Sequence, residues 1–237
     1  MYTLANNLIL KTRVAGGSIL PEIAGLKAWY KFRTANYNVR TNAVTSWQDA
    51  SANASVDMDI EPDASTQVDY NTTTGALSFT SGNSSVLETD NPSTNQLNLG
   101  AFTIFGVIDI VESGASNEAV LGRAGNDELR FYRGAAAAGF RARINGINRD
   151  IDLDSGLPTG KLLFTIIRAA NGLITIRING SAQTNTTSLD ISNLFDFTRL
   201  GNGATDSLMY EIAIYNVEVS GSDLTAIENE ITTRTGV

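Results

Sequence analysis

Alternation of apolar and polar positions with a period of two runs through much of this chain and is clearest at residues 161–180. Such alternation, rich in β-branched residues, is typical of β-strands. Residues 161–168 are apolar on both alternating faces, which predicts a strand covered on both sides. Residues 173–178 alternate isoleucine with polar residues, so we expect one wet face there. Asn171-Gly172 supplies the positive φ angles of a tight hairpin turn, and the whole segment therefore predicts two packed antiparallel sheets.

Shorter segments of the same kind recur along the chain and are bounded by glycine, asparagine or serine. The predicted strands are residues 26–32, 44–51, two short strands within 68–80, 86–87, 102–111, 119–122, 129–132, 140–144, 151–153 and 207–216. Residues 102–111 are apolar on both faces, which predicts a central strand. Many short strands without intervening helices favour a β-sandwich over repeated strand–helix–strand units.

The two ends of the chain differ from this strand-rich body. Near the C-terminus, Ser220 as N-cap and Asp223 at the third helical position form a predicted capping box before apolar residues at helical spacing. This pattern predicts one short helix packed on a sheet. At the other end, residues 1–22 form an N-terminal arm, which ends at a Gly-Gly-Ser break and Pro21. We expect either a loosely packed leader or a segment that docks on a neighbouring subunit, with the sandwich domain at residues 23–237.

Composition narrows the chemistry that the chain can support. The 237 residues are 42% hydrophobic, which is enough for one large β-domain with a substantial core. Cysteine and histidine are both absent, which excludes disulfides, thiolate metal sites and any Ser-His-Asp triad. A net charge of -8 disfavours nucleic acid and anionic membranes as partners, because phosphate contacts need clustered Lys and Arg. No apolar run approaches the length of a membrane span, and the N-terminus lacks the pattern of a signal peptide.

Four segments, in this order, resemble the laminin-G-like, concanavalin A-like jelly rolls. They are GLKAWY (25–30) followed by WQDAS (47–51), FTIFGV (102–107), TIIR through IRING (165–180), and YEIAIYN (210–216) followed by the capped helix. The resemblance covers residues 23–237 and implies an all-β jelly-roll sandwich of two antiparallel sheets. This fold serves lectins, hydrolases and purely structural modules, so it implies no single function. Members of the family occur in secreted bacterial proteins and on the surface of bacteriophage particles.

Residues 57–61, Asp-Met-Asp-Ile-Glu, place three acids on one face of a predicted strand. Glycoside hydrolases related to this family carry an E-x-D-x-E strand whose outer glutamates act as nucleophile and acid/base, and paired carboxylates are what glycosidic cleavage needs. Here the first acid is Asp57, and no Trp or Tyr lies nearby to stack a sugar. We therefore favour a solvated sheet edge and keep a hydrolase acting through Glu61 as the remote alternative.

A second set of alternating charges lies on two neighbouring predicted strands. Asp150, Asp152 and Asp154 alternate with apolar residues, and Arg141 and Arg143 occupy the outward face of the preceding strand, across an Asn-Gly turn. We expect cross-strand ion pairs here, each worth about 0.2–1 kcal/mol. The alternative is a calcium site built from carboxylates and loop carbonyls, as some laminin-G-like domains have. We therefore name Arg141, Arg143, Asp152 and Asp154 as candidate ligand-binding residues, and we expect no catalytic residue and no cofactor unless calcium binds here.

Arginines crowd the middle of this acidic chain. The crowded positions are Arg123, Arg130, Arg133, Arg141, Arg143 and Arg149. Solvated strand faces explain most of them, and the alternative is a recognition patch for an acidic glycan or a neighbouring subunit. Trp29 and Trp47 lie in apolar patterns, so we expect them in the core rather than stacked on sugars.

The function that we favour at this point is a non-enzymatic structural surface protein of a bacteriophage virion, such as a capsid decoration, head-fibre or tail-associated subunit. Four features motivate it together with the family resemblance: a domain that stands alone from Met1, no secretion signal, no cysteine or histidine, and an apolar N-terminal arm suited to assembly. We expect a homo-oligomer that contacts other virion proteins through residues 1–22, without nucleic acid and without membrane insertion. The alternative is a carbohydrate-binding module, with or without calcium, that recognises a cell-surface glycan from a virion or a bacterial surface. A glycoside hydrolase is the third class.

Overall fold

The central element of the computed structural model is β9 (Phe102–Ile110), which pairs antiparallel with β14 (Lys161–Arg168) on one side and β20 (Ser207–Tyr215) on the other. All residues of β9 except Asp109 are buried. This burial follows from the sequence, because a strand that is apolar on both faces needs a covering layer on each side. The predicted central strand is thereby confirmed.

The structure describes only part of the chain. The described residues are 20 and 23–237, apart from 52–57, 63–66, 81–84, 111–117, 124, 134–137, 157 and 202–205.

The first sheet has nine strands, and β9 lies near its centre. Its main path runs through β16 (Ser181–Ala182), β15 (Leu173–Ile178), β14, β9, β20, β6 (Ala76–Phe79) and β5 (Asp69–Asn71). Two further strands pair off this path, β1 (Leu26–Tyr30) with β20 and β17 (Thr187–Ser188) with β15.

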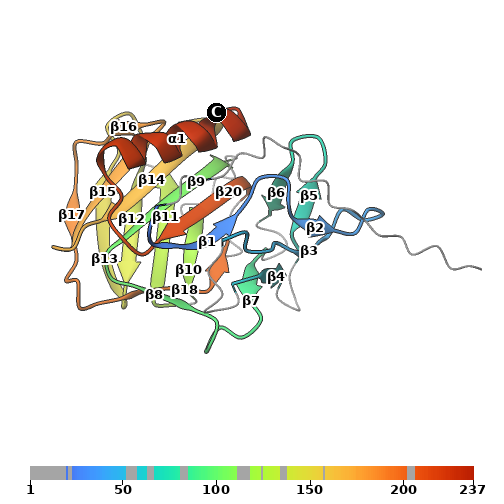
Figure 1. The fold of residues 1–237 in the computed structure, drawn as a ribbon, viewed down its shortest axis with the longest axis horizontal. Coiled ribbons are helices and arrows are strands. Elements are labelled where there is room, and N and C mark those ends of the chain that lie inside the picture. Colours follow the sequence, from blue (N-terminus) through green and yellow to red (C-terminus); the bar gives the residue numbers. More distant parts are fainter. Residues whose placement is uncertain are drawn as a thin grey trace, which may run out of the picture.

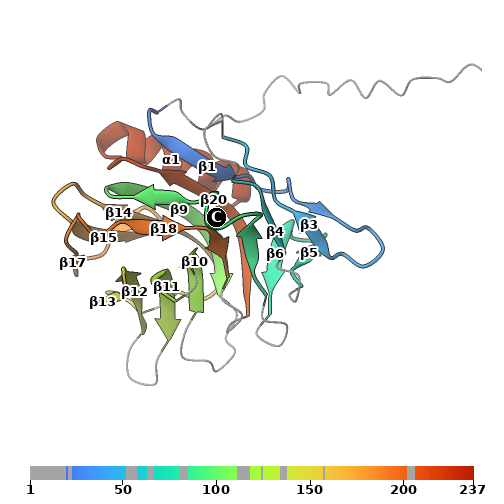
Figure 2. The same ribbon diagram turned by 90° about the horizontal axis from the view of Figure 1, so that it is seen from below.

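The second sheet has seven strands and packs face to face on the first. In order it contains β13 (Ile147–Asp152), β12 (Ala138–Ile144), β11 (Asp127–Arg133), β10 (Glu118–Arg123), β19 (Arg199–Leu200), β7 (Leu87–Thr89) and β4 (Ile60–Pro62). Two small two-stranded sheets complete the fold, β18 (Phe195–Phe197) with β8 (Leu97–Leu99), and β2 (Asn36–Tyr37) with β3 (Val44–Ser46). The β2–β3 hairpin projects from the body at the right of both views (Figures 1 and 2).

Three layers follow from these pairings, as Figure 2 shows. Helix α1 (Gly221–Thr235) lies on the outer face of the first sheet, and the second sheet lies on its other face. One apolar cluster fills the space between the sheets, and a second lies between the first sheet and α1. No described helix or strand covers the outer face of the second sheet (Figure 2). The predicted all-β sandwich of two antiparallel sheets with one C-terminal helix is confirmed.

The hairpin between β14 and β15 differs in detail from its prediction. Its loop has three residues, because Ala169 still pairs with Leu173, and Gly172 donates to the carbonyl of Ala169. Gly172 has a φ of 83°, whereas Asn171 does not adopt a positive φ. This is the type I turn with a left-handed third residue that three-residue hairpins use. A Cβ on Gly172 would lie 2.0 Å from the carbonyl oxygen of Leu189, so close packing also requires glycine there.

The outer face of β15, the second strand of this hairpin, is less exposed to solvent than the sequence predicted. Arg177 points toward α1, where it bonds to Glu228 of the helix. The expectation of a wet face on residues 173–178 was therefore wrong at Arg177, because the helix covers it.

Helix α1 begins after Ser220 as predicted, but the capping box does not form. Ser220 has extended backbone geometry and makes no side-chain capping bond. Gly221, the first helical residue, has a φ of 59°, whereas a capping side chain reaches the following amides only when the first residues are helical. No helix in the described part of the chain is long and apolar enough to cross a membrane.

Both tryptophans belong to the core, as predicted. Trp29 is 6% exposed and donates its indole N–H to Glu211, and Trp47 is 1% exposed and donates to the carbonyl of Lys31. Of the predicted arm, Leu20 packs in the cluster beneath α1 and is 3% exposed. Residues 1–19, 21 and 22 lie outside the described residues, so the role of the arm stays a prediction.

Candidate functional site: an arginine face on the second sheet

Three arginines gather on the outer face of the second sheet because strands β11 and β12 alternate. Their inward positions are buried in the core between the sheets: Leu129, Phe131, Phe140, Ala142 and Ile144. The intervening residues therefore project outward, away from the first sheet. We call Arg130, Arg141 and Arg143 the arginine face.

Strand register arranges this face in two rows. In the first row, Arg130 on β11 lies opposite Arg141 on β12, which lies opposite Asp150 on β13. In the second row, Arg143 lies between Glu128 on β11 and Asn148 on β13. The two rows are neighbours on the same face, because their members are two residues apart along each strand.

The first row contains one well-formed ion pair. Arg141 donates from Nε to Asp150 Oδ1 at 2.5 Å and from Nη2 to Oδ2 at 2.8 Å. These bonds from Arg141 hold the pKa of the Asp150 carboxyl below its usual value. The predicted cross-strand ion pair is therefore confirmed for these two residues, and its side chains are 27% and 44% exposed.

The remaining two arginines are less well matched. Arg130 has an ion pair with Glu128 at 3.4 Å, and both side chains are only 14% exposed. Burial lowers the pKa of Arg130, an effect that Glu128 opposes and that the charges of Arg141 and Arg143 reinforce. The Nε atoms of Arg130 and Arg143 are buried and have no hydrogen-bond partner among the residues that the structure describes. Within the described part of the chain, Arg143 forms no hydrogen bond or ion pair, although Glu128 faces it across the strands.

The other two candidate residues lie apart from Arg143. Asp152 is exposed at the far end of β13, opposite Gly139. Asp154 follows the strand and accepts bonds from the backbone and hydroxyl of Thr184 at 2.9 and 2.5 Å, which lower its pKa. The four candidates thus do not converge, and a ligand-binding role for them stays a prediction.

A calcium site was the other prediction for this region. Among the described residues, no three acidic side chains come close enough together to hold a metal ion. Asp150 is bonded to Arg141 and Asp154 to Thr184, so carboxylates expected as ligands have protein partners here. A role for calcium stays a prediction.

The acidic segment at residues 57–61 is only partly described, because Asp57 lies outside the described residues. Asp59 accepts a hydrogen bond from the backbone amide of Asp49 at 2.7 Å. Glu61 is exposed on β4, directly opposite Glu88 of β7. The position of Glu61 on an outermost strand of the second sheet agrees with the solvated edge that we favoured.

The sequence did contain a signal for the members of the arginine face that were not named as candidates. Glu128 and Arg130 alternate with Leu129 and Phe131, which is the pattern that identified Arg141 and Arg143. Which strand pairs with which, and in what register, could not be read from the sequence. The structure supplies it, and with it the contact between Arg130 and Arg141.

Comparison with known proteins shows similarity at the level of the fold. No protein-family model matches the chain, and no curated protein matches it in sequence. Solved structures do match. One is botulinum neurotoxin type C, whose cell entry depends on interaction with two ganglioside molecules, at 15% identity and a TM-score of 0.59 over 87% of this chain and 51% of that chain.

Two further structures widen the comparison. The binding domain of botulinum neurotoxin serotype D/C matches with 14% identity and a TM-score of 0.58, over 87% of this chain and 52% of that chain. Trypanosoma rangeli sialidase in complex with sialic acid matches with 15% identity and a TM-score of 0.56, over 92% of this chain and 34% of that chain. This chain therefore has a lectin-like β-sandwich fold and spans about half of each toxin chain and a third of the sialidase.

Proposed function

We propose that this chain is a non-enzymatic recognition module that binds a carboxylate-bearing glycan at the arginine face. The observation that carries the proposal is Arg143, a guanidinium on an open sheet face without a partner in the described part of the chain. A desolvated donor without a partner costs about 1–3 kcal/mol, so the folded protein gains no stability from this arrangement. The buried Nε is closed to a ligand, whereas the two Nη atoms of Arg143 are not among the buried atoms and have no described partner, so a ligand can bond to them.

A carboxylate is the chemical group that fits. The guanidinium is a planar fork that binds carboxylate with two parallel hydrogen bonds. Glu128 and Asp150 already neutralise Arg130 and Arg141, so the face has a single unmatched positive charge. One unmatched charge favours a ligand with an isolated carboxylate, such as a sialic acid or uronic acid, over a polyanion that needs many phosphate contacts.

The fold comparison guides the choice of test ligand. Gangliosides and sialic acid are what the matched toxin and sialidase structures name, and both carry a carboxylate. Because the identity is about 15% and only part of each chain is covered, these ligands enter as probes for this chain rather than as assigned substrates.

The experiment compares 3′-sialyllactose with lactose by isothermal titration calorimetry, alongside a glycan array that includes uronic-acid oligosaccharides. We expect saturable binding of carboxylated glycans and none of lactose. Arg143→Gln should weaken binding at least tenfold, because charge-assisted hydrogen bonds contribute about 1.5–3 kcal/mol. Arg149→Gln is the matched control, since Arg149 alternates to the other side of the same sheet and, among the described residues, bonds to the carbonyl of Asn148 alone. Binding that ignores the carboxylate, or equal loss in both variants, would contradict the proposal.

The surface of a bacteriophage particle is our proposal for where the module acts, and it rests on the family resemblance and the apolar arm. Deleting residues 1–19 keeps Leu20, which packs beneath α1, and should leave the unfolding temperature of the body unchanged. The truncated protein should no longer form the homo-oligomer or enter particles, as measured by sedimentation velocity and by particle purification. Normal incorporation of the truncated protein would refute a docking role for the arm.

A further inference from the structure

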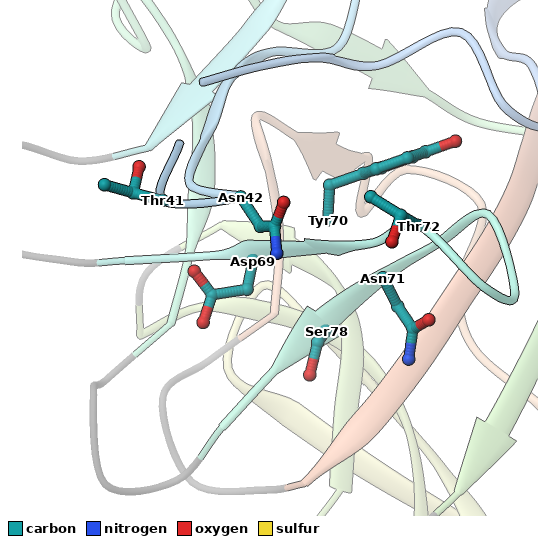
Figure 3. Close-up of a pocket in the computed structure, with 7 residues that line it drawn as sticks. All are labelled: Thr41, Asn42, Asp69, Tyr70, Asn71, Thr72 and Ser78. Atoms are coloured by element: carbon teal, nitrogen blue, oxygen red, sulfur yellow. The ribbon is translucent and has the colours of Figure 1, made fainter. Parts of the chain in front are cut away.

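A polar hollow lies at the β5 end of the first sheet, where the β2–β3 hairpin meets the outermost strand (Figure 3). Its volume is about 350 Å³, at the small end of the ~300–1,000 Å³ usual for ligand pockets. The lining residues are Thr41, Asn42, Asp69, Tyr70, Asn71, Thr72 and Ser78. The hollow belongs to the first sheet, whereas the arginine face belongs to the second, so the two sites are independent.

Strand alternation builds the floor of this hollow. Asp69 lies opposite Ser78 in register, and Asn71 lies opposite Ala76, so the outward residues of β5 and β6 share one face. The side chains of Asp69, Asn71 and Ser78 extend to the same side of the two strands in Figure 3, whereas the ring of Tyr70 extends away from them. Tyr70 is instead 9% exposed and packs in the core between the sheets.

The hairpin supplies the wall, and backbone bonds fix it in place. Ala43 forms a β-bridge with Asp69, and the amide of Tyr70 donates to the carbonyl of Asn42 at 2.7 Å. Asn42 adopts a φ of 59°, a left-handed geometry that asparagine tolerates better than most residues. The rings of Tyr37 and Tyr70 stack with their centroids 4.3 Å apart, and this contact holds the base of the hairpin against β5.

Several polar groups in the hollow have hydrogen-bonding capacity left. Asp69 accepts one bond, from Gln67 to Oδ1, and its Oδ2 has no partner among the described residues. Asn71 uses its Oδ1 for the amides of Thr73 and Thr74, which leaves its NH₂ group as a donor. In the same part of the structure, the side chains of Asn42 and Ser78 bond to no described residue. The hollow therefore presents a carboxylate acceptor, amide donors and a hydroxyl that can do both.

We propose that this hollow binds one neutral sugar residue. Sugar hydroxyls donate and accept at once, so they can donate to Asp69 while accepting from the amides of Asn71 and Asn42. No Lys or Arg lines the hollow among the described residues, and Asp69 would repel an anion, so a carboxylated or phosphorylated ligand does not fit. A module with one site for an acidic sugar and another for a neutral one would hold two parts of a surface glycan.

The test is a two-dimensional amide NMR titration of the full chain with the methyl glycosides of glucose, galactose, mannose and N-acetylglucosamine. We expect saturable shifts from at least one of them at residues 41–42, 69–72 and 78, with a millimolar dissociation constant. Asp69→Ala should weaken this binding at least fivefold, and Ser78→Val should weaken it less. Asp90→Ala is the control, because it removes an exposed acid that directly follows β7 of the other sheet and lies outside both proposed sites.

The same titration separates this proposal from its competitors. Sugar-induced shifts that persist in the presence of a chelator support a sugar site. Shifts produced by calcium alone, with no effect of any sugar, would overturn it in favour of a cation site. The proposal is also overturned if no glycoside gives saturable shifts at about 50 mM, or if Asp69→Ala binds as well as the unchanged chain does. Binding of 3′-sialyllactose at the arginine face decides none of these outcomes, because it concerns the other sheet.

Discussion

The outer faces of the two sheets treat charged side chains in opposite ways. On the first sheet, under α1, Glu211 is fully buried and accepts hydrogen bonds from Trp29, from the amide of Phe32 and from two nitrogens of Arg234. On the second sheet, which no described element covers, the guanidinium of Arg143 has a buried Nε and no described partner. The part of the first sheet under α1 pairs this charge, whereas the face of the second sheet has a donor without a described partner.

This difference separates stability from recognition. Burying an unpaired charge is costly, so a covered face must pair every ion that it encloses. Glu228 of α1 follows the same rule, since it accepts from Thr165 and from two nitrogens of Arg177. An open face faces no such requirement, because a partner can arrive from outside. The contrast is therefore between structural ion pairs beneath α1 and an arginine on the second sheet for which we propose a ligand.

The largest effect should follow from Glu211→Gln. The change removes the buried carboxylate that pairs with Arg234 at 2.5 Å, and Arg234, whose side chain is 9% exposed, keeps the more exposed ion pair with Glu230. Breaking a buried pair in this way costs about 3–5 kcal/mol. The measurement is the free energy of unfolding from urea denaturation followed by tryptophan fluorescence.

Glu230→Gln is the matched control for this experiment. Glu230 pairs with the same Arg234 at 2.9 Å from four residues earlier in α1, and 26% of its side chain is exposed. Helix pairs of this spacing contribute about 0.3–0.5 kcal/mol. If the two variants lost the same free energy of unfolding, burial would not determine how much an ion pair on this face contributes to stability.

A smaller loss should follow from Glu228→Gln, which weakens the attachment of α1 to the first sheet. Glu228 is 5% exposed and receives Arg177 Nε and Thr165 Oγ1, both at 2.8 Å. Hydrogen bonds to charged groups contribute about 1.5–3 kcal/mol, and the exposure of 22% at Arg177 moderates the loss. Hydrogen exchange should show the loss as faster exchange in the helix. Unchanged exchange in α1 would contradict a role for Glu228 in holding it.

The ion pair on the open face should contribute less again, and only above a certain pH. Arg141 lowers the pKa of Asp150, so the stabilisation is complete above the unfolded value of about 3.9 and is lost as the pH falls through the folded pKa. We expect Asp150→Asn to cost about 0.2–1 kcal/mol at pH 7 and close to nothing at pH 2. Urea denaturation of both proteins at the two pH values checks this. A difference that persists at pH 2 would exclude the ion pair as its cause.

Much of this architecture could be predicted from periodicity, because burial on both faces leaves a direct trace in the sequence. The continuous apolar runs at residues 102–111 and 161–168 predicted central strands, and the alternating charges predicted the outward positions of Arg141 and Arg143. The single charge in the apolar run at residues 207–216, Glu211, was also a signal, since an acid at that position needs a buried partner.

Contacts between distant segments could not be predicted in the same way. Arg177 was expected in water because the sequence does not show that α1 folds back over β15. The hollow at Asp69 joins β5, β6 and the β2–β3 hairpin, and none of these segments carries a motif that marks a site. Register and the docking of separate elements decide such sites, and both depend on tertiary structure rather than on local pattern.

The smallest effect on stability should follow from Arg143→Met. The sign of this change in the free energy of unfolding tests most directly whether the two sheet faces differ. Methionine keeps the apolar stem and removes the buried Nε that has no partner. Replacing an unsatisfied polar group by an apolar group of similar shape is nearly neutral or stabilising. We therefore expect a change of about zero, or a gain of about 0.5–1 kcal/mol, in the same urea experiment that detects the loss in Glu211→Gln. If the open face exists for recognition, the variant that folds at least as well should be the one that no longer binds 3′-sialyllactose. A loss of stability comparable to that of Glu228→Gln would show instead that Arg143 is held by the fold, and the difference between the two faces would disappear.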